Sequence, residues 1–454
     1  MLQTLVLFCL SLGLLIVEAS PPSEATIDDL EFVLIHGGSA YAVSAKNPKS
    51  ISGEVTIPAL YNGKPVTWIM THAFENCSAI TSVIFPDTLI SIGEWAFYGC
   101  SALATIDLSD TEMTFIGERA FAECTALSKA LLPNTITSIQ DLAFDNCRSL
   151  TSIDLSGMPI TSIKSGTFNQ CSALTSVLLP DTASYVGSEA FQGCSALASI
   201  DLSHTAVTSI QSGTFNGCTA LTSIRLPNSL NSIGNEAFKG CSALASIALP
   251  DNVTTIGSWA FSGCFALASI DLSKLTIQSI EASVFNLCTA LTSLVLPYSV
   301  SSIRDNAFSH CKHLASVQFL GSAPTLGTDS FLSTGSNLGG LTITIYESHE
   351  ASYASWSRDV YTFNVIDNPS TGPVMLVLQT HYDPSNQAFN IITKVEDSAS
   401  NMSLQHTANL GGAWIPVASL AYTEATDANN GTVTRTVTLD PATQPTGFYR
   451  LISE

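Results

Sequence analysis

The stretch "FYGCSALATIDLSDTEMTFIGERAFAECTAL", residues 97–127, contains one motif twice, first as "FYGCSAL" and then as "FAECTAL". Cys100 and Cys124 occupy equivalent positions in the two copies. Cysteines at such positions either carry out chemistry, as redox groups, metal ligands or nucleophiles, or they mark the period of a structural repeat. The other cysteines of the chain distinguish these two interpretations.

The same spacing extends through most of the chain. When Cys9 is set aside, the other cysteines follow one another at intervals of 23 or 24 residues, and each comes three residues after a phenylalanine. A fixed period in this range predicts a solenoid, in which each coil stacks on the one before. The cysteines of this predicted ladder are Cys77, Cys100, Cys124, Cys147, Cys171, Cys194, Cys218, Cys241, Cys264, Cys288 and Cys311.

One coil can be interpreted residue by residue from the segment "CSALASIDLSHTAVTSIQSGTF" at 194–215. Leu197, Ile200 and Leu202 follow an L-x-x-I-x-L pattern, which predicts a short strand with its apolar residues inward. After a turn, Val207 and Ile210 are expected on the opposite wall. About six buried apolar side chains per coil contribute roughly 1.5–3 kcal/mol each. No coil covers its own open faces, so stability depends on neighbouring coils.

Two kinds of corner explain the two coil lengths. The 24-residue coils contain "DLS", at 107–109, 154–156, 201–203 and 271–273, whereas the 23-residue coils end their strand with proline. Proline has no N–H and a fixed φ, so it ends a strand and starts a turn. Asp and Ser can form the same corner through side-chain hydrogen bonds, with one more residue.

The repeat unit "IGxxAFxGCSALxSIxLPxxxxxIG" resembles the BspA-like bacterial leucine-rich repeat family, and the lead-in "EVTIPALYNGKPVTWIMTHAFENCSAI" at 54–80 resembles its usual opening. The resemblance covers about residues 30–365. It implies a curved solenoid with strands on the concave wall. It also implies an exported or surface protein that acts in adhesion or protein binding and has no shared active site. The "DLS" coils depart from the family pattern.

The sequence therefore predicts an α/β-type repeat solenoid, mostly β, followed by a small all-β sandwich. The expected domains are an N-terminal cap at 21–66, the solenoid at 67–335, a C-terminal cap and linker at 336–372 and the sandwich at 373–454. A strand is expected at Leu341–Tyr346, with Trp356 covering the open end of the array. Six short alternating runs after residue 373, separated by turn sequences, favour the antiparallel sandwich.

Residues 1–20, "MLQTLVLFCLSLGLLIVEAS", are predicted to be a secretory signal peptide, because an apolar run precedes the small pair Ala19 and Ser20. No later stretch is long and apolar enough for a transmembrane helix. The alternative is a buried N-terminal helix. We therefore expect a secreted or cell-surface protein. Its partner is expected to be an extracellular protein or glycan and not nucleic acid, because the net charge is −21.

The cysteine ladder is expected to be structural. A zinc site needs four ligands that converge on one point, whereas these thiols lie along an axis, one per coil. Parallel inward side chains also disfavour disulfides, although coil spacing alone would permit them. We therefore predict buried free thiols, no metal and no cofactor.

The remaining candidate site is the outward face of the L-x-x-I-x-L strands. Serine precedes an outward residue in most coils, and that outward residue alternates between Asp and aliphatic side chains. Either these are solvated positions of a duplicated repeat, or they form a groove for an extended basic or hydroxyl-rich partner. Charge reversal of Asp154 and Asp201 is expected to weaken a basic partner without affecting folding. The candidate ligand-binding residues on this concave face are Asp107, Asp154, Asp201, Arg225, Asp271, Ser152, Ser199 and Ser223.

The function predicted from the sequence is adhesion, or protein or glycan binding, by an exported, non-enzymatic repeat protein. Two alternatives remain open. A carbohydrate-active enzyme on a right-handed β-helix also has coils of this length, but such enzymes cluster carboxylates on neighbouring coils, and here the Asp residues fall on alternate coils. A purely structural coat protein would bind no ligand saturably.

Overall fold

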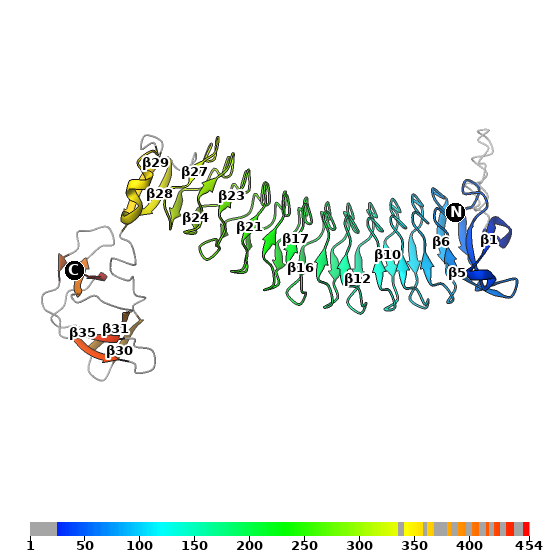
Figure 1. Cartoon of the computed structure of the whole chain (residues 1–454), viewed down its shortest axis with the longest axis horizontal. Helices are drawn as coiled ribbons and strands as arrows, with labels where there is room; N and C mark the ends of the chain where they lie inside the picture. The colour runs from blue at the N-terminus through cyan, green and yellow to red at the C-terminus, as the bar shows by residue number, and fades with distance from the viewer. Residues whose placement is uncertain are drawn as a thin grey trace, which may run out of the picture. The chain divides into compact units, whose positions relative to one another are not determined.

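The computed structural model describes residues 25–334, 340–356 and 361–366, together with the strand backbones between 379 and 453. The predicted signal peptide at 1–20 lies outside the described residues. The chain divides into two compact units, and each is treated separately. The larger unit is the repeat array, whose coils stack side by side (Figure 1).

The longer strands of successive coils form one wall of the array, which we call the long-strand wall. Its strands lie side by side and pair in parallel within short sheets, in register, so that Asp107 lies beside Leu131 and Asp154 beside Leu178. The strands are β6 (Ile80–Ile84), β8 (Thr105–Asp107), β10 (Lys129–Leu131), β12 (Ser152–Asp154), β14 (Ser176–Leu178), β16 (Ser199–Asp201), β18 (Ser223–Arg225), β20 (Ser246–Ile247), β22 (Ser269–Ile270), β24 (Ser293–Leu296) and β26 (Ser316–Phe319).

A second wall, the short-strand wall, is built from two-residue strands that also pair in parallel and begin with β5 (Lys64–Ile69). The sequence "SI" recurs in most of them, with Ser outward and Ile buried. The strands are β7 (Ser91–Ile92), β9 (Phe115–Ile116), β11 (Ser138–Ile139), β13 (Ser162–Ile163), β15 (Tyr185–Val186), β17 (Ser209–Ile210), β19 (Ser232–Ile233), β21 (Thr255–Ile256), β23 (Ser279–Ile280), β25 (Ser302–Ile303) and β27 (Thr325–Leu326).

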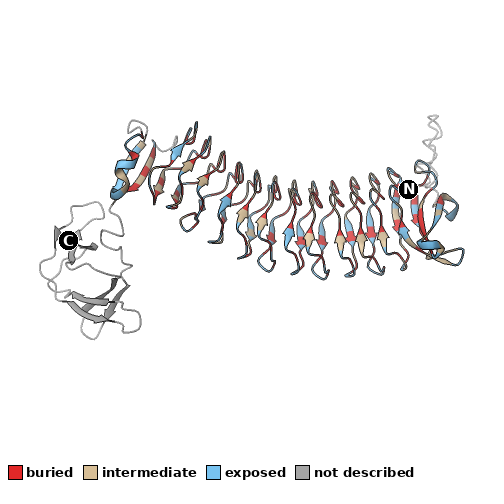
Figure 2. Ribbon diagram, viewed as in Figure 1, coloured by how far each residue is buried: buried red, intermediate tan, exposed pale blue. Residues whose placement is uncertain are grey.

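The core lies between the two walls, and buried residues line the inner side of every coil (Figure 2). In the coil used for the sequence prediction, Leu197, Ile200 and Leu202 are buried on the long-strand wall, and Val207 and Ile210 are buried opposite them. The predicted inward faces are confirmed. The strands from β6 to β27 are only two to five residues long, so the alternation of buried and exposed residues decides which face of each strand points inward.

The two walls are joined by a tight turn that contains the repeated phenylalanine, and we call this turn the phenylalanine corner. Twelve rings stack in one column, from Phe74 to Phe331, and all are buried. Neighbouring ring centroids are 5.0–5.7 Å apart, and the ring planes differ by no more than 12°. Parallel rings at this centroid distance are offset-stacked, a favourable arrangement for aromatic quadrupoles.

The backbone of the phenylalanine corner has an unusual conformation. In every coil the residues two before and two after the phenylalanine have positive φ, as in Glu236 (57°) and Gly240 (72°) beside Phe238. These two residues and Phe238 donate their N–H groups to the next coil, to the carbonyl oxygens of Ser258, Ser262 and Ala260 respectively. Each coil repeats the pattern, so the peptide groups of the corner align head to tail along the array, as they do in a helix.

An antiparallel hairpin closes the N-terminal end of the array. Strands β1 (Leu30–Ile35) and β2 (Ala40–Ala45) pair with each other, and β2 continues the short-strand wall by pairing with β5. Phe32, Tyr41 and Tyr61 pack together, the Phe32 and Tyr61 rings being stacked at 3.9 Å. The remaining elements here are η2 (Ile27–Asp29), η3 (His36–Gly38), β3 (Gly53–Thr56), which pairs with β6, and β4 (Leu60–Tyr61).

At the other end, β28 (Leu341–Tyr346) extends the long-strand wall beside β26, and Thr342 donates its N–H to the carbonyl oxygen of Ala315. The bounds of β28 match the predicted strand. The Trp356 ring meets Phe319 edge-on at 5.4 Å and is buried, as expected of a residue that covers the last coils. The helix η4 (Glu347–Tyr353) and strand β29 (Tyr361–Ile366) complete this region.

The predicted C-terminal β module contains two antiparallel sheets, in the strand orders β30-β31-β35-β34 and β33-β32-β36. Each of the six predicted runs contains at least one strand. The strands are β30 (Gln379–Asp383), β31 (Ala388–Val395), β32 (Met402–Thr407), β33 (Ile415–Pro416), β34 (Tyr422–Thr426), β35 (Val433–Leu439) and β36 (Phe448–Ser453).

Removing one ring from the phenylalanine column tests its role. Phe191→Ala is expected to lower the free energy of unfolding by about 3–5 kcal/mol, because it deletes a buried ring and the stacking on both neighbours. Urea unfolding followed by circular dichroism measures the change. Thr208→Ala, at an exposed position directly before β17, is the control and should change the free energy of unfolding by less than about 0.5 kcal/mol. Equal effects would show that the column contributes little.

Candidate functional site

The cysteine ladder lies directly behind the phenylalanine column. All eleven thiols are free and buried. From Cys100 onward each Sγ donates a hydrogen bond to the carbonyl oxygen of the phenylalanine in the preceding coil, as Cys194 does to Phe168 (3.2 Å) and Cys218 to Phe191 (3.1 Å). The thiols therefore link successive coils, and the prediction of buried free thiols is confirmed. Among the described residues no cluster of three or more His, Cys, Asp or Glu side chains could hold a metal ion.

Burial makes these thiols unreactive. Desolvation raises the pKa of Cys218 and Cys264 from 9.0 to about 12, and burial raises the pKa of Cys194 and Cys241 well above the ordinary value. The thiolate is the nucleophilic and metal-binding form of cysteine. Thiols held neutral in this way act as small apolar groups and weak donors.

The outward aspartates of the "DLS" coils hold the corner that follows their strand. In Asp154 one carboxylate oxygen, Oδ1, accepts hydrogen bonds from the Ser156 N–H (2.9 Å) and from its hydroxyl (2.7 Å). The corresponding pairs in the other three coils are Asp107–Ser109, Asp201–Ser203 and Asp271–Ser273. This confirms the Asp/Ser corner predicted from the coil lengths.

Corner formation keeps these side chains charged. Hydrogen bonds from the serine hydroxyl and then the serine N–H lower the pKa of Asp107, Asp201 and Asp271. The second carboxylate oxygen takes no part in the corner. Charge reversal of Asp154 or Asp201 is expected from the sequence to leave folding unaffected, but these hydrogen bonds show that it would also remove the acceptor that holds a corner. Substitution by Asn removes the charge and keeps an Oδ1 acceptor.

The structure brings the predicted site residues together on the long-strand wall. The register within each strand pair, together with the backbone hydrogen bonds that join the neighbouring coils between the pairs, places the outward residues in one row. These residues are Ile84, Asp107, Leu131, Asp154, Leu178, Asp201 and Arg225. All seven are exposed. Ser152, Ser199 and Ser223 are also exposed and belong to the adjacent row, two residues earlier in each strand. The wall thus presents carboxylates, hydroxyls and aliphatic side chains in regular order.

Not all the carboxylates of the row are equally available. Arg225 Nη1 lies 3.5 Å from Asp201 Oδ2, and His204 lies 3.9 Å from the other carboxylate oxygen. The positive charge of Lys129 contributes to the lowered pKa of Asp107. Asp154 forms no ion pair with any residue that the structure describes, and it lies in the row between the exposed Leu178, its register partner, and the exposed Leu131 of the preceding strand. Its negative charge is therefore available to a partner.

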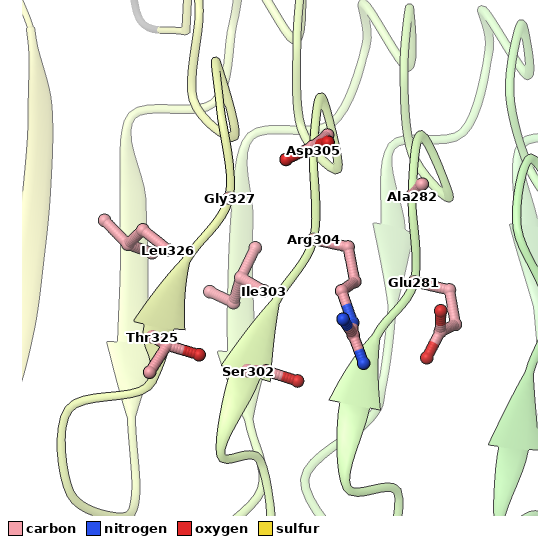
Figure 3. A pocket seen from close by; sticks show the side chains of 9 residues that line it. All are labelled: Glu281, Ala282, Ser302, Ile303, Arg304, Asp305, Thr325, Leu326 and Gly327. Atoms are coloured by element: carbon pink, nitrogen blue, oxygen red, sulfur yellow. The ribbon is translucent and has the colours of Figure 1, made fainter.

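The short-strand wall contains a surface depression that sequence reasoning did not single out. Its volume is about 350 Å³, and Glu281, Ser302, Arg304, Asp305 and Thr325 contribute polar groups to its lining (Figure 3). The small residues Ala282 and Gly327 also line it. Asp305 uses Oδ1 to accept the Thr328 N–H (2.7 Å), so it has a structural role. In the sequence, this depression was indicated only by small residues (Ala282, Gly327) close to charged ones (Glu281, Arg304) in neighbouring coils.

These features define the class of protein: a solenoid of leucine-rich repeats whose outer walls present its exposed polar and charged side chains. The family model described as "BspA type Leucine rich repeat region" matches residues 54–158, 143–233 and 208–337 in six copies. These ranges cover more than half of the chain, so the protein belongs to this family. The search of curated proteins gave no match.

Several solved structures are similar to this chain. A leucine-rich repeat protein from Bacteroides ovatus is 24% identical, with a TM-score of 0.49, and the match covers 76% of this chain and 100% of that one. A leucine-rich cell surface protein from Faecalibacterium prausnitzii is 28% identical (TM-score 0.47, 66% and 89% covered). The pneumococcal vaccine antigen PcpA is 18% identical (TM-score 0.49, 77% and 100% covered).

The thiol ladder makes the array sensitive to alkali. The folded pKa values are raised, so above pH 9 the unfolded chain loses thiol protons that the folded chain keeps, and stability falls as pH rises towards 12. Below about pH 8 this contribution is fully present. Each buried thiol should lower the free energy of unfolding by about 1.4 kcal/mol per pH unit in that window.

Cys218→Ser isolates this effect from other alkaline titrations, because its hydroxyl can donate to the same Phe191 carbonyl without titrating. The slope of unfolding free energy against pH between 9 and 11 should be shallower in the variant by about 1.4 kcal/mol per pH unit. Identical slopes in parallel urea titrations would mean that the thiol is solvated in the folded array.

The corner function of Asp154 can be separated from its charge. Asp154→Ala should lower the free energy of unfolding by about 1 kcal/mol, because the Ser156 N–H and hydroxyl lose their acceptor. Asp154→Asn keeps an Oδ1 acceptor and should change it by less than about 0.5 kcal/mol. Thermal or urea unfolding of the two variants provides the comparison, and equal losses would argue that the charge stabilises the corner.

Proposed function

We propose that this protein is an exported, non-enzymatic leucine-rich repeat protein that binds an extracellular protein or glycan through its long-strand wall. One observation carries the proposal. The wall presents in-register rows of exposed carboxylates, hydroxyls and aliphatic side chains over successive coils. Membership of the BspA type family supports a protein-binding or adhesion role.

The wall suits a large partner better than a small molecule. Its strands form a parallel surface whose polar groups are spread along the array at coil intervals of about 4.8 Å. Contacts distributed in this way can engage a long, regular ligand at many weak points. The net charge of −21 favours a neutral or basic partner, because like charges would repel it.

The catalytic alternative, a carbohydrate-active enzyme, receives no support from the arrangement of the carboxylates on this wall. The paired acid and base carboxylates of glycosidases differ in environment, since one is held protonated and the other ionised. Here Asp107, Asp154 and Asp201 lie on alternate coils with leucine between them, and the same kind of Ser hydrogen bonds holds each of them, and also Asp271, in a corner. This shared corner contact makes them structural acceptors as well as surface charges.

Charge removal on the wall tests the proposal. The triple variant Asp107→Asn, Asp154→Asn and Asp271→Asn should reduce binding of the full chain to immobilised matrix proteins or cell-wall glycans at least about threefold, because surface charge pairs contribute up to about 1 kcal/mol each. Surface plasmon resonance against the panel gives the affinities.

The matched control carries Asp87→Asn, Glu112→Gln and Asp251→Asn, three exposed acidic residues outside the wall, and so has the same net charge. It should bind as the unmodified protein does. If both triple variants lose the same affinity, only net charge matters. If neither loses any, the long-strand wall is not the binding surface.

Export is tested independently of binding. Expressed with its first twenty residues in a secreting host, the protein should be recovered outside the cell with Pro21 at its N-terminus, because the predicted signal ends at Ser20. Mass spectrometry of the intact secreted chain identifies the cleavage site. Recovery of the uncleaved chain inside the cell would contradict the prediction. Among the described residues no helix is long and apolar enough to cross a membrane.

A further inference from the structure

The long-strand wall has a period of two coils in its first half, and this period suggests the kind of chain that it binds. Three exposed aliphatic residues, Ile84, Leu131 and Leu178, are 48%, 36% and 52% exposed and lie on alternate coils of the row. Asp107 and Asp154 lie between them. Since adjacent strands are about 4.8 Å apart, like residues repeat every 9.6 Å or so, roughly two strand spacings.

This spacing distinguishes between the regular conformations of a partner that lies along the array. A polyproline II helix repeats every three residues, or about 9.3 Å. A β-strand returns the same face every two residues, about 6.8 Å, and an α-helix advances about 10.5 Å in seven residues. From Ile84 to Leu178, two repeats of polyproline II therefore differ from the wall by about 0.6 Å. The repeats of a β-strand and of an α-helix differ from the spacing of the wall by more than this.

We infer that the segment of the wall from Ile84 to Leu178 binds a proline-rich, basic segment of a protein in polyproline II conformation, running along the array. This inference rests on the proposed function and specifies its partner. One apolar residue in three would pack on Ile84, Leu131 and Leu178. A Lys or Arg between the last two contacts reaches the carboxylate of Asp154.

The Lys or Arg of the partner is placed opposite Asp154 because opposite charges attract. Within the described part of the chain Asp154 forms no ion pair, whereas Asp201 faces Arg225 at 3.5 Å. Asp154 Oδ1 is held by Ser156, which fixes the side chain and leaves the second oxygen for the ligand. Beyond Asp201 the alternation is lost, because Arg225 and Ala248 take the next two positions of the row. The matching surface therefore ends at that coil.

The test uses the full chain and a fluorescein-labelled peptide of five Pro-Pro-Lys repeats, measured by fluorescence anisotropy. The control peptide has the same ten prolines and five lysines in irregular order. The regular peptide should bind at least about fivefold more tightly than the control peptide. Asp154→Asn should lower the affinity for the regular peptide about fivefold, as expected for the loss of one surface charge pair. Leu131→Ser and Leu178→Ser should also weaken it, whereas Asp251→Asn should not.

Three results would overturn the inference: equal binding of both peptides, unchanged affinity in Asp154→Asn, or no binding of the regular peptide. If one of these results occurs while the triple variant of the wall still shows reduced affinity for a matrix protein or glycan, the polyproline II assignment fails and the proposed function stands. If the wall variants change no interaction at all, the proposed function fails as well.

Discussion

The contact between successive phenylalanine corners is the constraint on which the array depends. Stacked rings, one-directional peptide hydrogen bonds and S–H···O=C bonds all act at the same place, as between Phe168, Phe191 and Cys194. None of these contacts exists within an isolated coil, so a coil gains its stability only when a neighbour is present. The repeat length follows from this contact, because every coil must return its ring to the column whether its strand ends in proline or in "DLS".

The same constraint explains why the exposed surface is so regular. Once the corners are in register, the long strands are in register too, and their outward residues form rows. Outward residues can differ between coils, as Asp154 and Leu178 do, while the inward residues stay the same, provided that each coil has its own corner, Asp/Ser or proline. Binding properties can therefore vary along the wall while the stack is preserved. Asp154 has both functions, since one oxygen holds the corner and the other faces solvent.

Most of the fold was predictable because each residue type has one dominant physical role in a period of 23 or 24 residues. Leu197 and Ile200 had to be inward, and the outward position of Asp201 followed from alternation. The conformation of the corner was not predictable in the same way. Glycine at the positive-φ position, as in Gly193 and Gly240, was a signal, but Glu123 and Leu287 adopt the same conformation without one.

The sequence by itself determined the period, the inward faces, the two kinds of corner and the composition of the outward row, because these depend on local alternation and on which residues can end a strand. Only the tertiary structure decided which groups compensate one another between coils. In the stacked array Arg225 lies beside Asp201, and Asp154 lies between two leucines without an ion pair to any described residue. Each thiol from Cys100 onward donates to a phenylalanine carbonyl one coil away. Such contacts join residues separated by a full coil, and their geometry depends on how the coils stack.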